Sequence, residues 1–151
     1  MRALLAALLI LMALPAQGAE RQVWGFVTSD DMVQLFYGIP ESDGLTLAFI
    51  CRIKTRQIEV FSSVMPEGPK KGQLRTTILH NGNSSETFDG KLEGDGEDGL
   101  HFSSTVPAER KVTDILKSGR RLTIRVAGKR QSIPLRGVQK PLAQFETACF
   151  R

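Results

Sequence analysis

The chain has 151 residues, a net charge of +4 and a hydrophobic fraction of 41%, which suits one domain with a single core. Beyond an apolar stretch at the N-terminus, no run of apolar residues is long enough to cross a bilayer, so we expect no transmembrane segment in the mature chain. The charge is uneven, because residues 20–108 carry 8 Lys and Arg against 13 Asp and Glu, whereas residues 109–151 carry 11 against 3.

The first residues, 1–19, have the pattern of a cleavable signal peptide. A basic residue precedes an unbroken apolar run over residues 3–14, and a proline and small residues follow it. Cleavage near Gly18 or Ala19 fits this pattern best. We therefore expect a periplasmic or secreted protein in which residues 20–151 form a single β-rich exported domain.

Short segments of alternating apolar and polar residues predict antiparallel strands. The clearest segment is 45–53, in which Leu47, Phe49 and Cys51 share one face. Further strands are predicted at 22–28, 32–38, 57–64, 73–79, 84–92, 100–106, 121–127 and 131–136. Turns rich in glycine and asparagine separate these segments at roughly ten-residue intervals, as in many all-β domains. The pattern predicts a mainly β protein, either an antiparallel β-sandwich or a barrel-like fold, with two short helices and one disulfide.

The first helix is predicted over residues 109–118. Val112, Ile115 and Leu116 form one apolar stripe along it, and Gly119 stands at the position where helices commonly end.

The second helix is predicted to begin at Pro141 and to carry Phe145 and Cys149 on one side. Cys51 and Cys149 are the only cysteines, and an isolated pair in an exported protein most simply forms one disulfide. Two buried thiols or a metal site are the alternatives, but two cysteines without a nearby histidine make a poor zinc set. We expect a Cys51–Cys149 bond that fastens the last helix to a core strand.

No catalytic residues are predicted. The only histidines are His80, beside an Asn-Gly turn, and His101, which alternates outward on a strand, and no Gly-x-Ser-x-Gly motif occurs. With both cysteines in a disulfide, no thiol nucleophile remains for covalent catalysis. We expect no enzyme activity and no cofactor. A hydrolase function remains an alternative only if the fold brings distant carboxylates together.

An acidic segment spans residues 86–98, with glycines at positions 90, 94, 96 and 99. Calcium favours carboxylate oxygens on glycine-containing loops, so the composition is compatible with a calcium site. The spacing matches neither the EF-hand loop nor a glycine–aspartate repeat. We expect a solvated acidic hairpin loop and no metal.

A basic cluster follows in the C-terminal part. Arg121 and Arg125 project from one face of a strand, and Lys129, Arg130 and Arg136 flank the next strand. Such a cluster can bind an anionic partner, here an envelope protein or another anionic envelope component. A solvated sheet face is the alternative. Nucleic acid is not an expected partner, because the aromatic residues do not interleave with the basic run.

Several spaced motifs carry a resemblance to known families. They are Trp24, Ser29-Asp-Asp31, Val33-Gln-Leu35, Leu45-x-Leu-x-Phe-x-Cys51-Arg52, Ile58-Glu-Val60, Leu122 to Val126, Pro134-x-x-Gly137, and Pro141-Leu142 leading to Cys149. In this order they resemble the small exported accessory proteins associated with bacterial type VI secretion. The C-terminal part also resembles the invasion-associated locus B family. The sequence departs from the secretion-associated pattern at residues 125–134, where a longer polar strand is usual.

This resemblance implies a role in the bacterial envelope without enzyme activity. The leading interpretation is a non-enzymatic periplasmic accessory or binding protein, associated with secretion. The alternative is an inhibitor or binder of an envelope enzyme such as lysozyme, which would use the acidic segment at residues 86–98 against a basic target.

Overall fold

The structure, a computed structural model, describes residues 21–95 and 99–150. The predicted signal peptide, its cleavage site near Gly18 and Ala19, and positions 96–98 of the acidic segment lie outside the described residues. The strands are β1 (Val23–Thr28), β2 (Met32–Gly38), β3 (Leu45–Arg52), β4 (Gln57–Ser62), β5 (Leu74–His80), β6 (Ser85–Glu93), β7 (His101–Pro107), β8 (Arg121–Val126) and β9 (Lys129–Pro134). The helices are α1 (Lys111–Asp114) and α2 (Gln139–Cys149).

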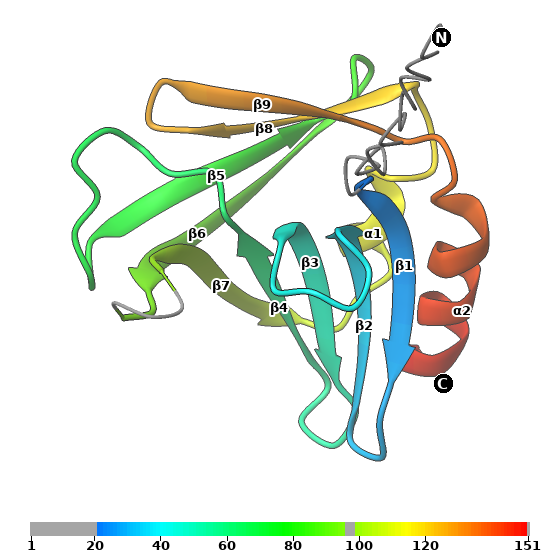
Figure 1. Cartoon of the computed structure of the whole chain (residues 1–151). Helices are drawn as coiled ribbons and strands as arrows, with labels where there is room; N and C mark the ends of the chain where they lie inside the picture. Colours follow the sequence, from blue (N-terminus) through cyan, green and yellow to red (C-terminus); the bar gives the residue numbers. More distant parts are fainter. Residues whose placement is uncertain (1–20, 96–98, 151) are drawn as a thin grey trace, which may run out of the picture.

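The strands of the described chain form one antiparallel sheet in the order β1-β2-β3-β4-β7-β6-β5-β8-β9. Hairpins join β1 to β4 in sequence, whereas β5, β6 and β7 are inserted in reverse order, so β4 pairs with β7 and β5 pairs with β8. The sheet is strongly bent, and β5, β8 and β9 lie across one end of the β1–β4 strands (Figure 1). The predicted mainly β, antiparallel architecture is confirmed.

A glycine in β6 allows this strand to approach β7 closely. This strand pairs with β5 over most of its length but with β7 only over Lys91–Glu93. A Cβ atom at Gly90 would lie 2.2 Å from the carbonyl oxygen of Ser103 on β7, closer than any side chain allows. The Ser104 hydroxyl donates a hydrogen bond of 2.7 Å to the Asp89 carbonyl at the same place. Only glycine permits this close approach of the two backbones.

The two edge strands, β1 and β9, meet at one point. The indole N–H of Trp24 on β1 donates a hydrogen bond of 2.7 Å to the carbonyl oxygen of Pro134, the last residue of β9. No backbone ladder pairs β1 with β9 in the described structure, so the sheet is not closed. A single side-chain hydrogen bond therefore joins its edges.

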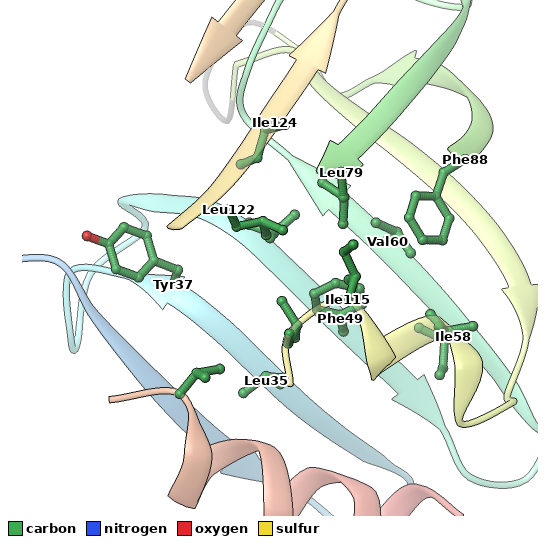
Figure 2. Packing of buried hydrophobic residues seen from close by; sticks show 14 of the residues in the cluster. Leu35, Tyr37, Phe49, Ile58, Val60, Leu79, Phe88, Ile115, Leu122 and Ile124 are labelled. Carbon is green, nitrogen blue, oxygen red and sulfur yellow. The ribbon is translucent and has the colours of Figure 1, made fainter. Parts of the chain in front are cut away.

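The core fills the inner face of the bent sheet. The largest fully buried side chains include Phe49, Phe102 and Phe145. Side chains from both halves of the sheet and Ile115, which follows α1, point into this cluster (Figure 2). Each such side chain stabilises the fold by about 1.5–3 kcal/mol relative to an exposed one.

The first helix is much shorter than predicted. The expected range was 109–118, but α1 covers only Lys111–Asp114, although the predicted apolar stripe is buried. The carbonyl oxygens of Ile115 and Ser118 accept hydrogen bonds of 3.0 and 3.2 Å from the side-chain amide of Asn81. These bonds take the place of continued helical hydrogen bonds, so the chain leaves the helix after one turn.

The second helix confirms the prediction in its main features. Helix α2 begins at Gln139, two residues before Pro141, and buries Phe145 and Cys149. Cys149 is bonded to Cys51 on β3, with the two Cα atoms 5.9 Å apart. The predicted disulfide is therefore present. None of the helices within the described ranges is long and apolar enough to cross a membrane.

A carboxylate on α2 holds the region around α1 in place. The side chain of Glu146 is 14% exposed. It accepts a hydrogen bond of 2.7 Å from the Thr113 hydroxyl and lies 3.1 Å from the Lys117 ammonium. The pKa of Lys117 is raised by its hydrogen bond to Asp114 and, after that, by its hydrogen bond to Glu146.

Candidate functional site

The predicted basic cluster lies on the β8–β9 hairpin, and three of its members share one face. Arg121, Arg125 and Arg130 are exposed. Arg125 lies directly opposite Arg130 in the antiparallel register, and Arg121 projects to the same side of β8 as Arg125. Leu122, Ile124 and Val126 of β8 are buried on the opposite face, which fixes the outward direction of the arginines. We call these three residues the outer arginine face.

The outer arginine face carries little internal compensation for its charge. Arg121 is held on the sheet because its Nε and Nη2 atoms each donate a hydrogen bond of 2.8 Å to Ser132. Within the described chain, the side chains of Arg125 and Arg130 have no ion pair and no hydrogen bond. Directly opposite residues place their Cβ atoms about 4.5–5.5 Å apart, a distance at which like charges destabilise the pair. The two guanidinium groups are therefore available to an external anion.

The other two predicted members lie elsewhere. Lys129 is opposite the buried Val126, so it lies on the inner side of the hairpin, and its ammonium pairs with Glu67 at 2.5 Å. Arg136 follows β9 in the loop to α2 and lines a cavity of about 500 Å³. Of the five basic residues in the predicted cluster, these two therefore lie outside the outer arginine face.

The reason is the position of the hairpin turn. The sequence analysis placed a strand at residues 131–136, but β9 covers Lys129–Pro134. Ala127 and Gly128 have φ values of 43° and 86°, so they form the turn themselves, as in the positive-φ turns of tight hairpins. Lys129 and Arg130 consequently belong to the strand and point to opposite faces, while Arg136 lies beyond its end.

The acidic segment at residues 86–98 is mostly strand rather than loop in its described part. Residues up to Glu93 belong to β6, where neighbouring side chains alternate between faces. Glu93 pairs with Lys91 at 2.7 Å, and this hydrogen bond lowers the pKa of Glu93. Asp89 accepts a hydrogen bond of 2.6 Å from Thr76. Among residues 21–95 and 99–150, no group of three or more His, Cys, Asp and Glu side chains is arranged to hold a metal ion.

The sheet brings one polar group together that the sequence analysis did not identify. His101 lies opposite Glu93 across the β6–β7 pair, and its ring packs at 4.8 Å from the Phe61 ring. Ser103 projects to the same face, two residues along β7. Its hydroxyl donates a hydrogen bond of 3.1 Å to Glu59 rather than to His101. Ser103 is therefore hydrogen-bonded to a carboxylate on β4, while His101 packs on Phe61.

The other histidine has a local structural contact. Nδ1 of His80 lies 3.0 Å from the Ser84 carbonyl oxygen and 3.0 Å from the Ser85 hydroxyl, across the β5–β6 turn. The ring thus joins the two strand ends, as its position beside an Asn-Gly turn suggests.

Similarity to known proteins adds nothing to this geometry. The chain matches no protein-family model, no curated protein and no solved structure. The outer arginine face is therefore the candidate site on its physical properties alone: fixed direction, exposure and unpaired positive charge.

Proposed function

We propose that the protein is a non-enzymatic binding protein of the bacterial envelope and that the outer arginine face contacts an acidic partner there. The observation that carries the proposal is the direct opposition of Arg125 and Arg130 without an acidic side chain between them. Two like charges in this position lower the stability of an isolated hairpin. A carboxylate or phosphate from a partner would remove the repulsion and add charge-assisted hydrogen bonds.

The proposed location is supported by the N-terminal sequence and by the disulfide. Residues 1–19 have the order of charged, apolar and small residues found in signal peptides. The bond between Cys51 and Cys149 fits an oxidising compartment, because disulfides persist there and are rare in the cytosol. An accessory role is also what the resemblance to secretion-associated proteins implies.

The sharpest test separates binding from stability at one position. In the Arg125→Glu variant, a carboxylate faces Arg130, so the hairpin should gain about 0.2–1 kcal/mol from an opposite-charge pair. The same change should weaken partner binding at least tenfold, because it places a negative charge in the contact. A merely structural arginine would not move stability and binding in opposite directions.

The measurement begins with capture of partners from envelope extract by the purified mature protein. Affinity for the recovered partner is then measured over about 50–300 mM salt, where screening weakens interactions between exposed charges. Lys70→Glu is the matched control, since Lys70 is an exposed residue outside the hairpin and the charge change is identical. Unchanged affinity and salt dependence for Arg125→Glu would contradict the proposal. Inhibition of lysozyme that is insensitive to Arg125→Glu would favour the acidic segment and the alternative function.

A further inference from the structure

A cavity of about 500 Å³ lies where the two edge strands of the sheet approach each other. Its lining includes Arg21 and Trp24 from the start of the described chain, Tyr37 from the end of β2, and Pro134 and Arg136 from the end of β9 and the loop that follows. The volume falls in the range of small-molecule sites, which is about 300–1,000 Å³. The cavity is separate from the Arg125–Arg130 pair, because β9 extends about 13 Å from Arg130 to Pro134.

The wall of this cavity is fixed by its aromatic residues. Trp24 and Tyr37 are 7% and 8% exposed, and their ring centroids lie 5.4 Å apart in a tilted arrangement. The indole N–H of Trp24 is already used, because it donates to the Pro134 carbonyl. Both rings are therefore held in place before any ligand arrives.

The hydroxyl group of Tyr37 is the polar end of this aromatic wall. Tyr37 as a residue is more than nine-tenths buried, but its hydroxyl is not one of the buried side-chain atoms that lack a partner, so the hydroxyl oxygen is accessible. It forms no hydrogen bond with residues 21–95 and 99–150. The hydroxyl points away from the hydrophobic cluster (Figure 2), and the residue lines the cavity. A donor is thus held at the cavity without a partner.

Two guanidinium groups complete the lining. Arg21 is exposed and so is Arg136, and neither forms an ion pair with any described residue. The described lining contains no acidic side chain. Arginine is well suited to carboxylate and phosphate groups, because its planar fork of donors matches their oxygens.

We infer that this cavity binds a small molecule through a carboxylate or phosphate group. Arg21 and Arg136 supply the positive charge, and the Tyr37 hydroxyl donates a further hydrogen bond to the bound oxyanion. The inference does not depend on Arg125 or Arg130, the pair that carries the proposed function, although Arg121 of the outer arginine face lies opposite Pro134 at the edge of the cavity. The cavity and the Arg125–Arg130 pair can therefore each fail its test without affecting the other.

The chain contains a single tryptophan, and it lines the cavity, so its fluorescence reports on this site directly. The purified protein is titrated at low ionic strength with glucose 6-phosphate, with glucuronate and with glucose. These probes share a sugar body and differ in whether they carry a phosphate, a carboxylate or no charge. A saturable change in Trp24 fluorescence is expected with one or both anions and not with glucose. The anion that saturates identifies the preferred group.

Variants then assign the binding to named atoms. Tyr37→Phe keeps the ring and removes only the hydroxyl, and it should weaken binding about tenfold, as expected for a hydrogen bond to a charged group. Arg136→Ala should weaken it at least as much, and Arg136→Lys should recover only part of the affinity because the planar fork is missing. Arg125→Ala, on the outer arginine face, should leave the affinity unchanged. Absence of a saturable change with both anions up to about 10 mM, near the weak end of measurable affinities, or equal affinity in Arg136→Ala, would overturn the inference.

Discussion

Removing the disulfide should have the largest effect on stability of any change that leaves the sheet intact. The bond joins Cys51 to Cys149 across 98 residues of sequence. Loop-closure entropy for a loop of this length corresponds to about 4.7 kcal/mol of stabilisation at 25 °C. Replacement of both cysteines by alanine should lower the free energy of unfolding by about that amount. With an unfolding entropy of about 2.1 cal/mol/K per residue over roughly 130 residues, Tm should fall by about 17 °C.

The assay is equilibrium unfolding in urea of three samples: the oxidised protein, the same protein after reduction, and the double alanine variant. Reduction removes the cross-link without removing the sulfur atoms from the core, so the reduced protein separates the entropic effect from lost packing. The reduced protein and the variant should agree within about 1 kcal/mol, because the cavity left by a buried cysteine is small. A loss below about 2 kcal/mol in the reduced protein would refute the reasoning, since the loop entropy predicts more than twice that value. The burial of Phe145 would then be enough to hold α2 on the sheet.

Four smaller effects follow from particular contacts. Glu146→Gln should lower the free energy of unfolding, measured in urea, by about 1–2 kcal/mol, because the charged acceptor that joins α2 to the region around α1 is lost. An unchanged free energy of unfolding would contradict this role of Glu146. The pKa of Lys117 is raised above its ordinary value of 10.5, first by its hydrogen bond to Asp114. The contribution of Lys117 to folding stability is therefore complete below about pH 10.5 and is lost as the pH rises further. The Lys117→Met variant should lose less stability at alkaline pH than the wild-type protein. Gly90→Ala should cost about 1–3 kcal/mol or prevent folding, because the new Cβ would lie 2.2 Å from a carbonyl oxygen of β7; a neutral result would show that β6 can move. Ala127→Asn should raise Tm, with a gain of about 0.5–1 kcal/mol, because alanine at a φ of 43° is strained; a fall in Tm would refute this.

Alternation of apolar residues was sufficient to predict most strands. The predicted segment 32–38 coincides with β2, and Leu47, Phe49 and Cys51 all point into the core as expected. These predictions succeeded because one face of each strand is buried, so the period-two pattern has a direct physical cause. The predicted segment 45–53 ends one residue too late, because Ile53 lies past the end of β3 and is 39% exposed.

Features that depend on contacts between distant residues could not be predicted in this way. The early end of α1 depends on Asn81, which lies in a turn more than thirty residues before the carbonyls it binds. In sequence, an asparagine beside glycine indicates only a turn. The reverse order of β5, β6 and β7 in the sheet also has no local signal, because each strand alternates in the same way whichever neighbour it takes.

The difference between the predicted strand at residues 131–136 and β9 has one cause, the position of a turn. Glycine marked the β8–β9 turn at Gly128, but the turn also uses Ala127 at positive φ, a conformation that alanine rarely adopts. Register sets the face of every side chain in a strand, and a shift of one residue exchanges the faces. Lys129 therefore lies opposite Val126 and Arg130 lies opposite Arg125, so these two neighbouring cations of the predicted cluster point to different faces.

The hydrogen bond from Trp24 to Pro134 has a consequence for how fast the chain can fold. It joins residues 110 positions apart, and the pairs β4–β7 and β5–β8 also connect distant parts of the chain. Proteins dominated by such non-local pairings fold in milliseconds to seconds, because loop-closure entropy is lost before the contacts form. Until the C-terminal segment arrives, β1 lacks both its hydrogen bond to Pro134 and its contact with α2, and an uncovered edge strand can pair with other chains. Aggregation during refolding should therefore compete most strongly before β9 and α2 are in place.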